Sequence, residues 1–398
     1  MTTDHESCVP RVALVHDYLI KQGGSENVVQ ALHALFPEAP LYSSLYAREL
    51  MPPEWQALSI HTSFLQAWAE RGGIFRVDYQ SRLKFLLPFM PLAYESFNFT
   101  GYDCVISSCH AYAKGILTGC ETLHISYLHS PTRYLWQASE TYSQQGLRQR
   151  WQQPLSQWLL HRLRQWDLLA AQRPDYLIAN SHYIRRQIEK FYRRSATVIY
   201  PPVDVEFFQP VDHPSQDYDL VACRLVPYKR VDIAIQAYNH LQRRLVVVGE
   251  GPELPRLQEM AGSTIEFLPH QSRSALRGLF AHCRAFVFPW AEDFGITPVE
   301  VQACGRPVIA LNQGGAKETI VPGQTGILFN QPTPEGLAQA ILAFDQQAWD
   351  PQVIRRQAES FSHKRFVVET EQFVQQAWQN FRQASSFPKA ATKTHPAS

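Results

Sequence analysis

The sequence predicts an α/β protein of two Rossmann-like domains whose parallel sheets face each other across a cleft. The chain has 398 residues, which exceeds the about 100 to 200 residues of one usual domain. Short β-branched runs alternate with helical patterns, as in the βαβ units of parallel sheets. A proline-rich polar stretch at 200–216, YPPVDVEFFQPVDHPSQ, separates two such series and predicts a linker.

We therefore expect a first domain over residues 1–204 and a second over 205–364. The strands expected in the first domain are Arg11–His16, Asp103–Ser108, Leu123–Leu128, Asp175–Ala179 and Thr197–Tyr200. Those expected in the second are Asp219–Ala222, Leu245–Val248, Thr264–Leu268, Ala285–Pro289 and Pro307–Ala310. The tail at 384–398 lacks apolar periodicity and is expected to be disordered.

Composition argues against several classes of protein. The formal net charge is +1, which does not favour a nucleic-acid binder. The seven cysteines form no C-x-x-C pair and predict reduced thiols, with no structural metal site. No apolar run approaches the about 18 residues of a spanning helix, and the acidic, polar N-terminal stretch does not resemble a signal peptide. We therefore expect a cytoplasmic protein.

Two segments, 63–97 and 134–172, interrupt the βαβ rhythm. The second carries apolar residues with the spacing of one helix face, namely Leu155, Trp158, Leu159, Leu163 and Trp166. Arginines fall near that face at Arg148, Arg150, Arg162 and Arg164. Either both segments pack on the first domain, or they form an aromatic and basic surface that contacts an anionic membrane.

The first strand is followed by a pair of glycines, Gly23 and Gly24, before a helix expected from Ser25. Paired glycines allow a ligand to approach the backbone closely, and the helix N-terminus offers free N–H groups. A tight turn that serves packing alone would give the same pattern.

The second domain opens with LVACRLVPYKRVDIAIQA, in which Arg224 and Lys229 follow a strand. Two fixed cations at the carboxyl edge of a parallel sheet suit a diphosphate, although solvated surface cations remain the alternative. The next strand ends in Gly249-Glu250-Gly251. Leu254 replaces the last glycine of the dinucleotide fingerprint, which argues against an NAD site.

The most specific motif is FPWAEDFGITPVEVQACGRPVIAL, where seven residues separate Glu292 from Glu300. A strand ends just before it, and a helix is expected from about Thr297-Pro298, since proline favours a first helical turn. Glu292 would then lie in a loop over the cleft and Glu300 in the first turns of the helix. The backbone N–H groups around Phe294, Gly295 and Ile296 would face an anion.

These motifs resemble the retaining GT-B glycosyltransferases of family 4, also called group 1. The resemblance spans nearly the whole second domain, through segments 224–235, 245–254, 292–310 and 312–320. In the first domain it includes Gly23-Gly24, NSHYIRRQI at 180–188 and YLHSPTRYLW at 127–136. The last string is similar to a branch rich in bacterial mannosyltransferases for lipopolysaccharide and exopolysaccharide. FSHKRF at 361–366 is similar to the family's C-terminal element, so a helix over 365–383 is expected to pack back on the first domain.

The resemblance implies catalytic roles at four positions. Arg224 and Lys229 match the pair that neutralises the donor diphosphate. Glu292 matches the acid that contacts hydroxyls of the transferred sugar. His129 matches a histidine near the sugar and the reacting face.

It also implies a nucleotide-sugar site around them. Glu300 matches the acid that holds the ribose hydroxyls, and the backbone of Leu268–His270 matches the edge that binds the base. Gly249 falls in the same implied site. The loop close to the donor phosphate or the acceptor is matched by Gly23 and Gly24, and the remaining implied contacts are Phe294, Gly295 and Ile296.

The acceptor region is matched less specifically, by Ser181, Arg185 and Arg133. Family members that act on phosphorylated acceptors use basic residues near Arg185 and Arg186. Ser181 is also a good N-cap, so a capped surface helix with solvated arginines is the competing interpretation.

The implied reaction is retaining transfer of a hexose, with mannose favoured, from a GDP- or UDP-sugar to a glycan, lipid-linked or sugar acceptor in cell-surface polysaccharide synthesis. Cations would stabilise the leaving diphosphate, so neither a cofactor nor a divalent metal is expected. Alternatives are a sucrose-phosphate-synthase-like transfer from UDP-glucose to a phosphosugar, a GT-B sugar-nucleotide epimerase, and a non-catalytic binder. The expected location is cytoplasmic, and a transferase that acts on a lipid-linked acceptor could lie peripherally at the inner face of an anionic membrane.

Overall fold

A computed structural model describes the chain except for residues 1–9, 73–82, 84, 138–153, 212–215 and 386–398. It contains two parallel sheets, one in each half of the chain. The first sheet has the order β3-β2-β1-β4-β5-β6-β7, with strands Ile60–Thr62, Leu41–Ser43, Val12–His16, Cys104–Cys109, Leu123–Leu128, Tyr176–Ala179 and Thr197–Val198. The second has the order β10-β9-β8-β11-β12-β13, with strands Ile265–Leu268, Leu245–Val248, Asp219–Ala222, Ala285–Phe288, Val308–Leu311 and Gly326–Phe329. The predicted α/β fold class is confirmed.

Each predicted strand exists within a residue or two of its expected bounds. The central strands β1, β4, β5 and β9 are buried along their whole length, as their apolar residues predict. Three strands were missed, and they are β2, β3 and β13. These strands have three or four residues and lie at or next to a sheet edge. Such short runs, with polar residues in LYS and IHT, are too brief to show a period.

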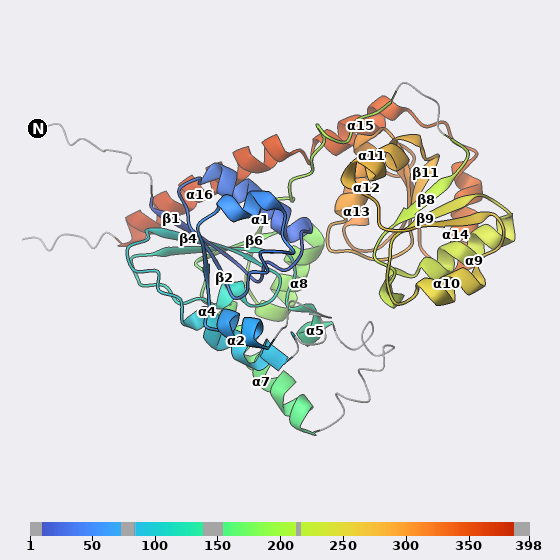
Figure 1. The fold of residues 1–398 in the computed structure, drawn as a ribbon. Coiled ribbons are helices and arrows are strands. Elements are labelled where there is room, and N and C mark those ends of the chain that lie inside the picture. Colours follow the sequence, from blue (N-terminus) through green and yellow to red (C-terminus); the bar gives the residue numbers. More distant parts are fainter. Residues whose placement is uncertain (1–9, 73–82, 84, 138–153, 212–215, 386–398) are drawn as a thin grey trace, which may run out of the picture.

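Helices cover both faces of each sheet (Figure 1). In the first domain they include α1 (Gly24–Leu35), α2 (Leu65–Arg71), α4 (Met90–Glu95), α5 (Arg133–Trp136), α7 (Pro154–Ala170) and α8 (His182–Tyr192). In the second they include α9 (Val231–Leu241), α10 (Leu254–Met260), α11 (Arg273–His282), α12 (Ile296–Ala303), α13 (Ala316–Thr319), α14 (Pro334–Phe344) and α15 (Pro351–Glu359). The carboxyl ends of both sets of strands border the space between the domains, which is where ligands bind in such folds.

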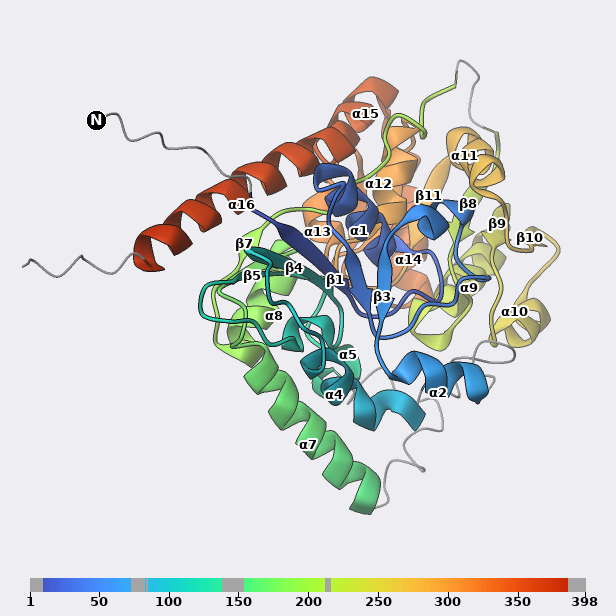
Figure 2. The same cartoon turned by 60° about the vertical axis from the view of Figure 1, so that its left-hand side comes forward.

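The last helix, α16 (His363–Ser385), leaves the second domain and runs along the first (Figures 1 and 2). Phe366, Val374 and Ala377 of α16 join the core cluster that contains Leu14 and Leu32. Its apolar face thereby ties the chain end to β1 and α1. The tail expected at 384–398 lies almost wholly outside the described residues.

Helix α7 belongs to the segment that interrupted the βαβ rhythm. Leu163 is buried, and Leu159 and Trp166 pack against the same core, as the helix-face pattern predicted. Trp158 does not follow the packing interpretation, since it is 59% exposed where α7 extends beyond the body of the domain (Figure 2). Arg148 and Arg150 lie outside the described residues, as does the side chain of Leu155. Among the described helices, none is long and apolar enough to cross a membrane.

Candidate active site

A cavity of about 740 Å³ lies between the two domains. Residues of the first domain that line it include Gly23, Gly24, Glu26, His110, His129 and Arg133. Residues of the second include Arg224, Lys229, Glu292, Phe294, Gly295 and Ile296. A second cavity of about 940 Å³ continues along the second domain past Arg224, Gly249, His270 and Glu300. Many of the predicted site residues therefore border one or the other of two neighbouring cavities, and Arg224 borders both.

The second of the paired glycines lies against the second domain. Gly23 has an extended backbone with φ −158°, so this step needs no left-handed turn. A Cβ atom on Gly24 would lie 2.7 Å from Cδ1 of Ile296 in the second domain. A side chain at residue 24 would therefore require the Ile296 side chain to move, so glycine gives room for the close approach of α1 to the second domain.

Lys229 and Glu292 form an ion pair on the second-domain side of the cavity. The Lys229 ammonium lies 4.7 Å from the ring centroid of Trp290, and the Trp290 indole N–H donates to Glu292 Oε1 at 3.2 Å. Burial lowers the pKa of Lys229 to about 8. Both partners would become available to a ligand only by exchanging this contact for another.

Arg133 joins the domains by reaching from α5 to the loop that carries Glu292. Its Nε donates to Asp293 Oδ2 at 3.0 Å, and its Nη2 lies 3.5 Å from Glu292 Oε2. Sequence reasoning missed Asp293, although it stands beside Glu292 in the same motif. The guanidinium thus holds two neighbouring carboxylates across the cleft.

The predicted helix after Glu292 is α12, which begins at Ile296, one residue earlier than expected. Glu300 lies in its second turn and borders the larger cavity. Burial raises the pKa of Glu300 to about 7. The loop before α12 is held by the NQGG segment, where Gly315 N–H donates to Glu292 O at 2.8 Å.

Gly249 has a structural reason to be glycine. Its φ is +139°, and a Cβ atom there would lie 1.9 Å from Cys223 O. Its N–H donates to Leu268 O at 3.0 Å, which joins the ends of β9 and β10. His270 of the expected base-binding edge borders the larger cavity, and its N–H donates to Glu250 Oε1 at 3.3 Å.

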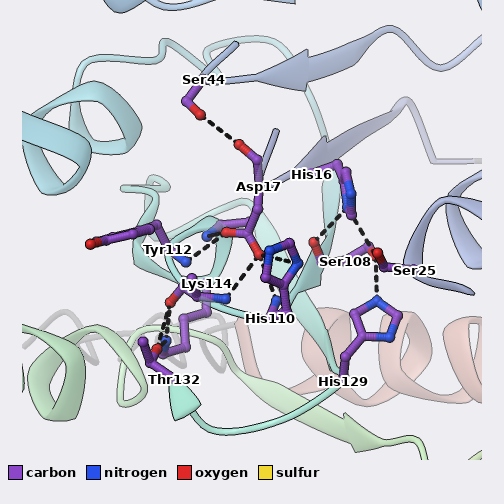
Figure 3. A network of polar contacts seen from close by, with 12 residues as sticks. His16, Asp17, Ser25, Ser44, Ser108, His110, Tyr112, Lys114, His129 and Thr132 are labelled. Atoms are coloured by element: carbon purple, nitrogen blue, oxygen red, sulfur yellow. Dashed lines mark hydrogen bonds and ion pairs between the residues drawn. The ribbon is translucent and has the colours of Figure 1, made fainter. Parts of the chain in front are cut away.

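Asp17 holds the loop that carries His110 in the first-domain wall of the cavity (Figure 3). This carboxylate accepts hydrogen bonds at 2.6 to 2.9 Å from four consecutive backbone N–H groups, those of residues 110–113. Burial alone would raise its pKa, but the charges of His110 and His16 and these N–H groups lower the pKa of Asp17 to about 2. The loop that carries His110 is thereby fixed to the end of β1.

His129 follows β5 and borders the cavity beside His110. The Ser108 hydroxyl lies 2.8 Å from its Nε2. Burial, together with the charges of His110 and His16, lowers the pKa of His129 to about 3. The ring is therefore neutral at physiological pH.

The predicted acceptor residues Ser181 and Arg185 do not line either of these cavities. Ser181 caps α8, as its N-cap propensity predicted: its Oγ accepts from Ile184 N–H at 3.1 Å and donates to Asp293 O at 2.7 Å. Arg185 pairs with Glu189 at 3.6 Å along the same helix. Within the described residues, no group of three or more His, Cys, Asp or Glu is arranged to hold a metal ion.

Comparison with known protein families covers both halves of the chain. Residues 22–207 match the family described as Glycosyltransferase Family 4, and residues 205–360 match Glycosyl transferases group 1. An uncharacterized glycosyltransferase of Methanocaldococcus jannaschii is 30% identical over 173 residues, which are 42% of this chain and 49% of that protein. A D-inositol 3-phosphate glycosyltransferase of Mycobacterium leprae is 33% identical over 179 residues, 39% of this chain and 42% of that protein. The chain thus spans less than half the length of these curated relatives.

Solved structures share the whole two-domain arrangement. Sucrose-phosphate synthase from Thermosynechococcus elongatus superposes with a TM-score of 0.70 at 17% identity, over 94% of this chain and all of that one. Anabaena HepE in complex with UDP superposes with a TM-score of 0.66 at 19% identity, over 93% of this chain and 100% of that chain. At these identities the likeness shows the fold alone, which is GT-B. The predicted GT-B fold is confirmed.

Proposed function

We propose that this chain, which consists of two glycosyltransferase domains in the GT-B fold, transfers a hexose from a nucleotide-diphosphate sugar to a glycan, lipid-linked or sugar acceptor. The observation that carries the proposal is the common cavity bordered by Arg224, Lys229, Glu292 and His129. It brings fixed cations, an acid and a neutral imidazole from both domains to one space. Such a set can bind a diphosphate and the sugar attached to it.

The leaving diphosphate would be stabilised by Arg224, Lys229 and the backbone N–H groups at the start of α12. Lys229 would exchange its partner Glu292 for the phosphate oxygens. Glu292 would then be free to accept hydrogen bonds from sugar hydroxyls, while Glu300 holds the ribose. We propose that these groups make a divalent metal unnecessary and that the reaction retains the anomeric configuration through an oxocarbenium-like state.

For the donor we favour GDP-mannose, because YLHSPTRYLW at 127–136 is similar to the mannosyltransferase branch. UDP-glucose is the main competitor. Purified protein incubated with each donor and an acceptor lipid or oligosaccharide extract, followed by NMR of the product's anomeric proton, tests both points. An α-mannosyl product from GDP-α-mannose supports the proposal. Isomerisation of the donor sugar without transfer would instead indicate an epimerase-type reaction.

A phosphosugar acceptor is the second candidate, but the environment of α8 does not favour it. A phosphate at that helix would need the free N–H groups of its first turn. The N–H groups of His182 and Tyr183 already donate to the Glu318 carboxylate at 2.8 and 2.7 Å. We therefore favour a glycan or lipid-linked acceptor and a role in cell-surface polysaccharide synthesis.

A lipid-linked acceptor would require contact with a membrane, and one exposed surface suits it. Trp68 of α2 packs edge to face against Phe64, just before α2, and Phe89, just before α4, at centroid distances of 5.3 Å. Phe85 and Leu92 of the same chain segment are exposed, and on α7 Arg162 lies over exposed Trp158. We propose that this aromatic surface gives peripheral contact with anionic lipid. Co-sedimentation with anionic vesicles at low salt, reduced in the Trp68→Ser variant, is expected; equal sedimentation with and without vesicles would contradict it.

A further inference from the structure

A chain of hydrogen bonds beneath the cavity wall ends at His129. It runs from Glu26 in α1 through His16 at the end of β1 and Ser108 in β4. Glu26 Oε1 lies 3.2 Å from His16 Nε2, His16 Nδ1 lies 3.2 Å from Ser108 Oγ, and Ser108 Oγ lies 2.8 Å from His129 Nε2. The adjacency of β1, β4 and β5 places His16, Ser108 and His129 side by side (Figure 3).

The contacts of His16 require both of its ring nitrogens to carry hydrogen. Nδ1 lies 3.0 Å from Ser108 O, a carbonyl oxygen that can only accept. Nε2 faces the Glu26 carboxylate, which accepts when ionised. Burial alone would lower the pKa of His16, but the hydrogen bond and charge of Glu26 raise it. His16 is therefore an imidazolium whose counter-ion is Glu26.

Glu26 is itself held in place by its neighbours at the start of α1. The Ser25 hydroxyl donates to Glu26 Oε2 at 2.9 Å. A Cβ atom on Gly23 would lie only 3.1 Å from the same oxygen. The sequence Gly-Gly-Ser-Glu thus lets the carboxylate lie against the helix start, where it faces His16.

The charge on His16 sets the direction of the hydrogen bond at Ser108. A hydroxyl has a single hydrogen to donate. His16 Nδ1–H lies 3.0 Å from Ser108 O and 3.2 Å from Ser108 Oγ, so Nδ1 cannot accept from the hydroxyl. Among the hydrogen bonds of the described residues, the acceptor left for the Ser108 hydrogen is His129 Nε2. That nitrogen must then be unprotonated, and the neutral ring of His129 must carry its hydrogen on Nδ1.

We infer that His16 and Ser108 are positioning residues that fix His129 as the tautomer with hydrogen on Nδ1, with Glu26 as the counter-ion that keeps His16 charged. The nitrogen of His129 that faces away from Ser108 is then a donor, which suits a sugar oxygen in the cavity. The other tautomer would present a lone pair, which can accept from a sugar hydroxyl but cannot donate to a sugar oxygen. The identity of the bound oxygen rests on the proposed function, whereas the tautomer belongs to the protein alone.

The test is ¹⁵N NMR of the full-length protein labelled at histidine, because protonated and unprotonated imidazole nitrogens have well-separated shifts. His129 and His16 are assigned from the spectra of His129→Asn and His16→Asn. We expect His16 protonated at both nitrogens and His129 protonated at Nδ1 alone. A wild-type His129 that carries its hydrogen on Nε2 would overturn the inference.

Ser108→Ala removes the donor to His129, and Ser108→Thr restores a hydroxyl. We expect Ser108→Ala to give mixed tautomers of His129 and a roughly tenfold or greater loss of kcat/KM, with Ser108→Thr recovering most of both. Ser107→Ala is the matched control, since Ser107 is buried on the same strand but contacts His124 and Ser126. An unchanged tautomer and rate in folded Ser108→Ala would refute the positioning role. Absence of transfer by the wild type would count against the proposed function only, because the spectrum decides the tautomer without substrate.

Discussion

Glu318 of the second domain caps a helix of the first: its two carboxylate oxygens accept from the backbone N–H groups of His182 and Tyr183 at the start of α8. Ser181 completes the cap and also donates to Asp293 O in the second domain. The N-terminus of α8 carries positive partial charge, so a carboxylate is a favourable partner. The domains are thus joined at the cleft by a helix cap and by the Arg133–Asp293 ion pair.

Replacing Glu318 with alanine is expected to loosen this junction. Loss of a cap costs about 0.5 to 2 kcal/mol, so amide exchange at His182 and Tyr183 should accelerate by up to roughly 30-fold. Native-state hydrogen exchange measures the exchange rates of these two amides. Glu206→Gln, at an exposed glutamate of the second domain, is the control. Unchanged protection of both amides in Glu318→Ala would show that the cap contributes nothing in solution.

Asp17 should make the first domain sensitive to acid. Its pKa is lowered to about 2 in the folded protein, so its stabilisation is complete above the unfolded value near 4 and is lost as pH falls towards 2. The loss should amount to about 2 kcal/mol. Asp17→Asn should remove that part of the pH dependence and leave some of the N–H groups of residues 110–113 unpaired. Urea unfolding between pH 5 and pH 2.5, about the range of this titration, measures both. Parallel stability curves for variant and wild type would contradict the assignment.

Lys114 and Asp167 form a buried ion pair that fixes α7 to the domain, with Nζ and Oδ1 at 2.6 Å. The Asp167 carboxylate also accepts from the hydroxyls of Thr132 and Tyr192 and from the Trp136 indole N–H, at 2.6 to 2.7 Å. Lys114→Met would leave this carboxylate without its counter-ion, which costs about 3 to 5 kcal/mol in buried pairs. Thermal unfolding of Lys114→Met compared with Lys190→Met, an exposed lysine of α8, tests it. Equal melting temperatures would exclude a structural role for the pair.

Lys229 should make diphosphate binding depend on pH. Burial lowers its pKa to about 8, so the free protein carries the required charge below pH 8 and loses it as pH rises. Binding an anion then requires proton uptake, and affinity should fall by up to about tenfold per pH unit above the pKa. Calorimetric titration between pH 7 and 9.5, from about one unit below that pKa to about 1.5 units above it, measures the change in affinity. Lys229→Arg keeps its charge and should give a flat curve; the same slope in both proteins would assign the effect to another group.

Much of the fold was predictable because each central strand is a short apolar run and because glycine and proline mark many of the turns between elements. The second-domain motif was also local: Glu292, Gly295 and Glu300 lie within nine residues of one another. Long-range contacts were not predictable. His16 meets Ser108 across 92 residues, and neither belongs to a local motif.

The same limit applies between the domains. Glu318 reaches His182 across 136 residues, and nothing in NQGGAKETI indicates that its acid will cap a helix of the other domain. The sequence predicted that Gly249 contacts a ligand. The structure gives another reason for glycine there, because its backbone lies against Cys223 and leaves no room for a Cβ atom. Patterns therefore located the cleft, whereas the contacts that hold it together depend on strand order and domain packing.

The most direct measurement is a thermal-shift titration of the wild type, Arg224→Ala and Arg256→Ala with GDP, UDP, dTDP, ADP and NAD. Arg256 lies exposed on α10 and serves as the control. A ligand at 100 times its dissociation constant adds about 2.7 kcal/mol of stability. We predict that one nucleoside diphosphate, GDP if the donor is GDP-mannose, stabilises the wild type and Arg256→Ala but not Arg224→Ala. Stabilisation of none of the three by any diphosphate, or an equal shift in Arg224→Ala, would contradict a nucleotide-sugar site at this cleft.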